Sequence, residues 1–162
     1  MKRNASSQPR QVASASLDAA QLAVVEQAIA EHQSVAGGLL PLLHQIQEGL
    51  GHVPDDAVPL VAEALNLSRA EVHGVLTFYH HFRREEPKGQ VVQVCRAESC
   101  LACGSDALWK VAQALGDHVT VEPVYCLGLC ASSPAVQIGN RCHARMTPDR
   151  LQRLVSAQKE AA

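Results

Sequence analysis

The segment QVVQVCRAESC, residues 90–100, opens the part of the chain that decides its fold. Its first five residues, 90–94, predict a buried strand, because a short apolar run rich in β-branched residues favours extended backbone. Cys95 stands at the end of this run, and Cys100 follows it in the pattern C-x4-C. The predicted strand therefore delivers a pair of cysteines to one edge of a sheet.

A second strand and a second cysteine pair repeat this plan. Residues 118–124 predict a strand, and Cys126 and Cys130 follow it in the pattern C-x3-C. If the two strands are neighbours, both loops lie at one edge of the sheet and the thiols converge. Four thiolates are the ligand set of a [2Fe–2S] cluster. We therefore predict that one such cluster, a one-electron carrier, is bound by Cys95, Cys100, Cys126 and Cys130.

The remaining residues of this part complete a mixed α/β domain. Apolar spacing predicts a helix from about Ser105 to Leu115. A Gly-Asn turn between 135–138 and 141–145 predicts a hairpin, and Pro148 suits the first position of a last helix. The order β-α-β-β-β-α is the outline of a thioredoxin-like half-fold.

The region before residue 88 contains no cysteine and predicts a small bundle of short helices. Ser16 is the expected cap of the first helix, and the sequence SRAE that begins at Ser68 is a capping box for the fourth. The expected helices cover about 17–32, 39–49, 55–65 and 69–79.

We predict an α+β chain in three parts: a disordered leader at 1–16, the helical bundle at 17–87 and the thioredoxin-like domain at 88–162. The leader has basic residues and serines but no apolar run, so it does not predict a secretory signal. A charged segment with Pro and Gly predicts the linker between the domains. Its residues Arg83 and Arg84 are expected to be solvated.

Composition narrows the possible functions. The net charge of -2 and an aromatic content of 3% argue against a nucleic-acid partner. No apolar run approaches the roughly 20 residues of a membrane helix, and no Gly-rich loop predicts a nucleotide site. Six cysteines without a secretory signal favour the cytoplasm, where clustered cysteines are more often metal ligands or redox groups than disulfides.

Other uses of the cysteines remain open. Cys95, Cys100 and Cys103 match the plant-type ferredoxin spacing C-x4-C-x2-C, with Cys126 or Cys130 as the fourth ligand. Cys100 and Cys103 also form a C-x2-C pair, which is typical of thiol-disulfide enzymes and of structural zinc sites. A zinc-stabilised interaction module would have no redox role.

Several residues are expected around the cluster. Arg96 adds positive charge, Gly128 lets backbone amides approach sulfur, and the helix near Ser105 directs its amides toward the site. Expected hydroxyl donors are Ser99, Ser132 and Ser133. The leftover thiols, Cys103 and Cys142, are expected to be buried free cysteines. No histidine is placed beside the cysteine loops, as a Rieske centre would require.

Several motifs together carry a family resemblance: SRAEVHGV at 68–75, TFY at 77–79, the two cysteine pairs, and Pro134. They resemble the thioredoxin-like [2Fe–2S] subunits of NADH dehydrogenase (the 24 kDa or E subunit) and of related NAD-dependent enzymes. Within that family, LPLLHQIQ at 40–47, TFYHHFR at 77–83 and CRAESC at 95–100 are similar to the gamma subunit of cytosolic molybdenum-containing NAD-dependent formate dehydrogenase. Ser133 stands where many members have Ala.

The resemblance implies an electron-transfer subunit with no catalysis of its own. The cluster would exchange single electrons with FMN on a partner subunit that also binds NAD, and a larger subunit would hold the molybdenum cofactor and oxidise formate. The equivalent subunit of respiratory NADH:quinone oxidoreductase or of an NAD-reducing hydrogenase is the alternative. The N-terminal helices and the TFY segment would dock against the flavin subunit, whereas packing of Phe78 and Tyr79 inside the bundle is the other possibility.

Overall fold

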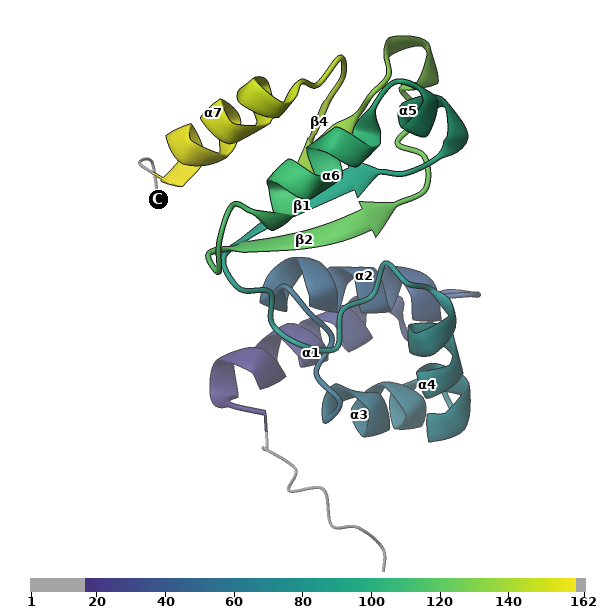
Figure 1. Ribbon diagram of the computed structural model, residues 1–162. Coiled ribbons are helices and arrows are strands. Elements are labelled where there is room, and N and C mark those ends of the chain that lie inside the picture. Colours follow the sequence, from purple (N-terminus) through teal and green to yellow (C-terminus); the bar gives the residue numbers. More distant parts are fainter. Residues whose placement is uncertain (1–16, 160–162) are drawn as a thin grey trace, which may run out of the picture. The chain divides into compact units, whose positions relative to one another are not determined.

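The computed structural model describes residues 17–159, so the leader predicted at 1–16 lies outside the described residues. The chain divides between Glu86 and Pro87 into two compact units, each with its own core (Figure 1). The elements are a set of helices in the first unit and a sheet with helices in the second, which confirms the α+β fold class. Among the described residues, no helix has the length and apolarity needed to cross a bilayer.

The described residues of the first unit, from 17 onward, form four helices. They are α1 (Ala19–His32), α2 (Leu39–Leu50), α3 (Ala57–Ala64) and α4 (Arg69–Phe78). The cap of α1 is Asp18, which forms a capping box with Gln21, so the prediction of Ser16 was wrong. The capping box predicted at the start of α4 is confirmed, because Ser68 and Glu71 exchange both hydrogen bonds.

Apolar side chains from all four helices form one core. The fully buried members include Val25, Leu42, Leu43, Ile46, Val53, Val61 and Val72. Gly51 ends α2 with φ of 79°, a conformation that costs glycine nothing and lets the chain turn toward α3. The core is almost purely aliphatic, as the low aromatic content predicts.

The segment after α4 belongs to the first unit. The buried side chain of Gln47 donates to the carbonyl of His81 at 2.9 Å and accepts from the amide of Arg83 at 2.6 Å. Arg84 forms a two-pronged ion pair with Asp55, with N–O distances of 2.9 and 2.7 Å. Arg84 is exposed, with 43% of its side chain accessible, as expected of a solvated charge, but its pairing with a carboxylate 29 positions earlier was not predicted.

The second unit is built on a four-stranded sheet in the order β2-β1-β3-β4. The strands are β1 (Gln90–Cys95), β2 (Val119–Val124), β3 (Val136–Ile138) and β4 (Arg141–His143). β1 pairs with β2 in parallel and with β3 antiparallel, and β3 and β4 form the predicted hairpin. The parallel pair is the feature that places both cysteine loops at one edge.

Helices α5 (Glu98–Ala102), α6 (Ser105–Gln113) and α7 (Pro148–Lys159) complete the unit. α6 packs on β1 and α7 packs on α6, as Figure 1 shows. Their core contains Val92, Val94, Leu108, Ile138 and Leu151. α5 was not predicted, because its five residues are too few to show a helical period. α6 ends two residues before the predicted Leu115.

Candidate metal centre

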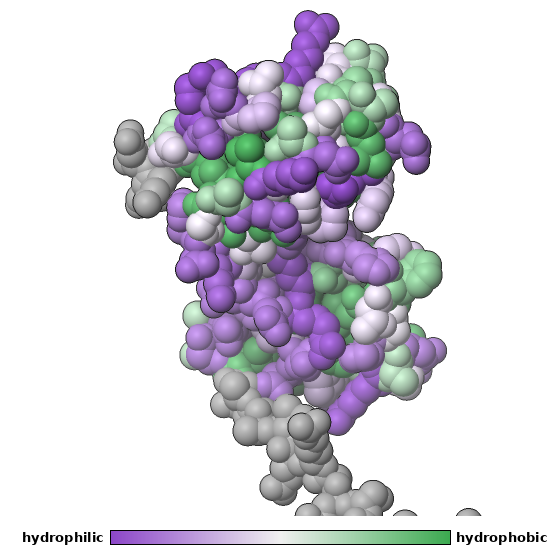
Figure 2. Space-filling view, viewed as in Figure 1, coloured by the Kyte–Doolittle hydropathy of each residue, from purple (hydrophilic) through white to green (hydrophobic). Residues whose placement is uncertain are grey.

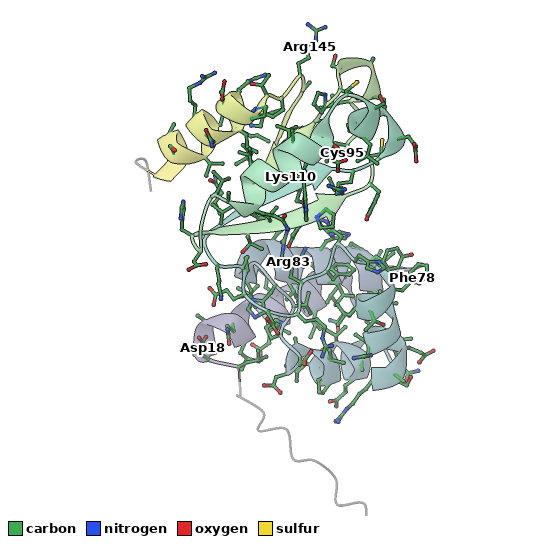
Figure 3. The ribbon with its side chains drawn as sticks, viewed as in Figure 1. Asp18, Phe78, Arg83, Cys95, Lys110 and Arg145 are labelled. Atoms are coloured by element: carbon green, nitrogen blue, oxygen red, sulfur yellow. The ribbon has the colours of Figure 1, made fainter. Side chains whose placement is uncertain are left out.

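Two neighbouring strand ends position the cysteines. Cys95 is the last residue of β1, and its register partner on β2 is Val124. The amide of Cys95 donates to the carbonyl of Ala135 on the other side, at 3.1 Å. In Figure 3, Cys95 lies where β1 passes into the turn before α5. The loop that follows Val124 carries Cys126, so both loops leave the sheet at the same edge.

The first pair, Cys95 and Cys100, is buried, with each residue 2% exposed. Burial raises the pKa of Cys95, but hydrogen bonds from the amides of Ala97, Cys126 and Leu127 and from the Cys100 thiol outweigh it, so the pKa lies below its ordinary value. Backbone amides directed at a sulfur stabilise negative charge on it. The Cys95 environment thus suits a thiolate ligand.

The second pair lies on an exposed loop between β2 and the short 3-10 helix η1 (Cys130–Ser132). The sulfur atoms of Cys126 and Cys130 are 3.6 Å apart. Two thiolates on one tetrahedral metal with bonds of about 2.3 Å lie about 3.8 Å apart. The amide of Gly128 donates to Cys126 Sγ at 3.4 Å, which confirms the role expected of this glycine.

The Cys130 thiol interacts electrostatically with the other three thiols. The pKa of Cys130 is raised, first by its hydrogen bond with Cys126 and then by the negative charge of Cys126, by desolvation, and by the charges of Cys100 and Cys95. Such mutual repulsion between thiolates is what a cationic metal centre relieves. The two cysteine loops lie beside each other, because the amides of Cys126 and Leu127 reach Cys95 and the Ser99 hydroxyl donates to the carbonyl of Cys130.

The arrangement is one of two pairs. A [2Fe–2S] cluster takes two protein ligands on each iron. Within residues 17–159, no three His, Cys, Asp or Glu side chains are grouped as they would be around a single metal ion. The residues present fit a two-iron cluster, with one pair held in the protein interior and the other on the surface loop.

Two of the three expected serines connect the loops. Ser133 Oγ lies 2.9 Å from Ser99 Oγ and 3.5 Å from Cys100 Sγ. Both hydroxyls also reach the carbonyl of Cys130, at 2.9 Å from Ser133 and 3.2 Å from Ser99. No hydrogen bond of the Ser132 hydroxyl is found in the described part of the chain. The sequence predicts the serines as hydrogen-bond donors. The contact between Ser99 and Ser133 was not predicted, because it forms only when the fold brings the two loops together.

Arg96, which was expected to add positive charge to the site, is paired with a carboxylate. Arg96 pairs with Asp106 at 2.8 Å and stacks over the ring of Trp109, with its Cζ 5.2 Å from the ring centroid. Its charge is thus largely balanced by a carboxylate on α6. The amide that reaches Cys95 from the helical segment belongs to Ala97, the N-cap residue of the unpredicted α5. The expectation that α6 supplies this amide finds no support among these contacts.

The two leftover cysteines are exposed, so the prediction of buried free thiols was wrong. Cys103 follows the last turn of α5 as its C-cap residue. Cys142 lies on β4, the edge strand of the sheet, and its thiol donates to Gln137 Oε1 at 3.5 Å. The exposure of Cys142 follows from the place of β4 at the edge of the sheet, which local sequence does not encode.

The TFY segment also has exposed side chains. Phe78 is 72% exposed and Tyr79 43%, whereas Phe82, which the sequence did not single out, is buried in the bundle core. Phe78 projects from the end of α4 in Figure 3, and Figure 2 shows hydrophobic surface in this part of the helical unit. Packing of Phe78 inside the bundle is therefore excluded.

Comparisons with known proteins agree with this geometry. The profile of the thioredoxin-like [2Fe-2S] ferredoxin family matches residues 25–159. The second E subunit of NADH-quinone oxidoreductase from Rhizobium meliloti (strain 1021) is 31% identical over 148 residues, which is 85% of this chain and 88% of that protein. NADP-reducing hydrogenase subunit HndA of Solidesulfovibrio fructosivorans is 28% identical over 134 residues, covering 74% of this chain and 76% of its own length.

A solved structure shares the fold. In a crystal structure of NAD+-reducing [NiFe]-hydrogenase in the H2-reduced state, one chain superposes with a TM-score of 0.65 at 23% identity. The match covers 77% of the present chain but only 22% of the hydrogenase chain, so it concerns one part of a longer protein. The likeness confirms the thioredoxin-like fold predicted from the order of strands and helices.

Proposed function

We propose that this chain, which belongs to the thioredoxin-like [2Fe-2S] ferredoxin family, is an electron-transfer subunit. Its four paired cysteines would hold one [2Fe–2S] cluster. The cofactor is that of the family; the assignment of Cys95, Cys100, Cys126 and Cys130 as its ligands is part of the proposal. The observation that carries it is the pairing of a buried and an exposed set of thiols at one edge of the sheet, with sulfurs 3.6 Å apart in the exposed pair.

Each part of the site has a role in this proposal. Amides from Ala97, Cys126 and Leu127 stabilise the charge on Cys95, and the amide of Gly128 does the same for Cys126. When bound, the cluster supplies reversible one-electron chemistry. The exposed loop with Cys126 and Cys130 brings one end of the site to the surface, where a redox partner can approach.

We further propose that the electron partner is a subunit that carries FMN and binds NAD. The two relatives described for this chain are subunits of NADH-quinone oxidoreductase and of an NADP-reducing hydrogenase, which supports an enzyme that uses a nicotinamide cofactor. Within this group we favour the gamma subunit of a molybdenum-containing NAD-dependent formate dehydrogenase, because the segments 40–47, 77–83 and 95–100 resemble that subgroup. A second candidate is the E subunit of NADH-quinone oxidoreductase or its hydrogenase equivalent, and the names of the relatives support this candidate.

Two measurements test this proposal in turn. Anaerobic iron and sulfide analysis of the purified chain should give about two of each, with an S = 1/2 EPR signal after dithionite. Zinc with no colour and no signal would leave only an interaction module. A tagged copy should then be isolated with its partners from the natural host. Molybdenum and formate-dependent reduction of NAD+ are expected; nickel with hydrogen-dependent reduction, or NADH-dependent reduction of quinone, would establish the second candidate.

A further inference from the structure

The hydroxyls of Ser99 and Ser133 form a bridge between the two cysteine loops. Ser99 lies in α5 and Ser133 follows η1, and their oxygens are 2.9 Å apart. This bridge faces two acceptors. One is the carbonyl oxygen of Cys130, at 2.9 Å from Ser133 and 3.2 Å from Ser99. The other is Cys100 Sγ, at 3.5 Å from Ser133 only.

The number of protons decides which bonds form. Each hydroxyl has one proton to donate. In the metal-free protein, either the Cys100 thiol or the Ser133 hydroxyl can be the donor in this contact. A thiolate that binds iron has no proton to donate. In the cluster-bound protein the contact between Cys100 and Ser133 therefore has one possible direction, with the serine as donor.

The second serine makes this direction possible. If Ser133 donates its proton to Cys100, it can no longer donate to the carbonyl of Cys130. Ser99 lies within 3.2 Å of that carbonyl and can replace it. With the proton of Ser133 on Cys100, the single proton of Ser99 is shared between the Cys130 carbonyl at 3.2 Å and Ser133 Oγ at 2.9 Å, so each acceptor has a donor.

We propose that Ser133 donates a hydrogen bond to the sulfur of Cys100 in the cluster-bound protein, and that Ser99 keeps the Ser133 hydroxyl in this orientation. The two serines together raise the reduction potential of the cluster. This inference rests on the proposed function, because it requires Cys100 to be a ligand. Reduction adds one negative charge, and a hydrogen bond to sulfur stabilises the reduced state more than the oxidised one. Cys100 is only 2% exposed, so water competes little for its sulfur.

Four variants of the full chain separate this role from a structural one. Ser133→Ala should make the potential more negative, with about a tenfold change in the equilibrium constant for reduction, or about 59 mV for a one-electron couple. Ser99→Ala should shift it less and in the same direction, because the proton of Ser133 is then shared with the Cys130 carbonyl. Ser133→Thr keeps the hydroxyl and should keep the potential. Ser132→Ala removes a neighbouring hydroxyl and is the matched control.

The measurements are EPR-monitored redox titration and electron–nuclear double resonance of the reduced cluster in H2O and D2O. The expected result is an exchangeable proton coupling in the unaltered chain, in Ser133→Thr and in Ser132→Ala, which Ser133→Ala lacks. A complete cluster in Ser133→Ala with unchanged potential and coupling overturns the inference and leaves the proposed function intact. If Ser133→Ala does not retain a cluster, an unchanged potential and coupling in Ser99→Ala overturns it instead. An unaltered chain that holds no iron overturns both.

Discussion

The two cysteine pairs of the candidate site are held in different ways. Cys95 and Cys100 lie on β1 and α5, are almost fully buried, and are surrounded by amide and hydroxyl donors. Cys126 and Cys130 lie on an exposed loop, and Cys126 has φ of 90°, in the left-handed region. It follows that packing holds the first pair in the interior, whereas the second pair has little packing and is held by hydrogen bonds of its loop, such as those to the Cys130 carbonyl.

The largest effect is expected from Cys100→Ala, which removes a ligand from the buried pair. Packing around this buried position keeps another thiol from moving into its place, so iron content should fall from about two to nearly zero. Loss of a metal centre that is coupled to folding should lower the free energy of unfolding of the second unit by more than about 4 kcal/mol. Iron analysis and chemical denaturation check this prediction. Retention of two irons would remove Cys100 from the ligand set.

A smaller effect is expected from Cys126→Ser on the exposed loop. A serine oxygen can ligate iron, and a loop with few packing contacts can adjust to its shorter bond. We expect a cluster with an altered EPR spectrum, because one ligand atom has changed. We expect its occupancy to fall by about twofold to fivefold, because the new ligand is loosely held. Cys100→Ser is the matched variant in the buried pair and should retain less. Equal occupancy in the two serine variants would contradict the difference between the pairs.

Chemical labelling of the metal-free chain should rank the same two pairs. A thiol reacts with iodoacetamide only when the reagent can reach it. Cys126 and Cys130 should be alkylated at least about tenfold faster than Cys95 and Cys100, because burial keeps the reagent away from Cys95 even though its lowered pKa favours the thiolate. Bound cluster should protect all four, while exposed Cys103 stays reactive as an internal control. Mass spectrometry of digested samples resolves each site, and fast labelling of Cys95 would show that the metal-free fold opens there.

The smallest effect is expected from Cys103→Ala. Cys103 is exposed, and no hydrogen bond of its thiol is found within residues 17–159. The change should leave iron content unaltered and stability within about 0.5 kcal/mol. If this variant loses the cluster and Cys126→Ser does not, the ligands follow the C-x4-C-x2-C pattern and the two pairs have been assigned wrongly.

Features with a local cause were predictable from the sequence. The strand beside Cys95, the capping box at Ser68 and the hairpin after Val136 each rest on residues close together in the chain. Features that depend on distant partners were not predictable. Arg84 meets Asp55 across 29 positions, and Ser99 meets Ser133 across 34.

The site shows the same division. The positions of the four cysteines could be predicted, because two strands end immediately before two short cysteine patterns. Their unequal burial could not, because it depends on α5, a helix of five residues without a readable period. The exposure of Cys142 likewise depends on β4 being an edge strand, which only the pairing of the whole sheet decides.

The left-handed backbone at Cys126 has a consequence for evolution. A side chain other than glycine in this region of φ costs about 1–3 kcal/mol. The backbone thus favours glycine at a position where the proposed ligation requires sulfur, and selection for the cluster would oppose this preference. In a descendant that no longer used its cluster, Cys126→Gly would relieve strain at no functional cost, and we expect such lineages to drift to glycine at this position.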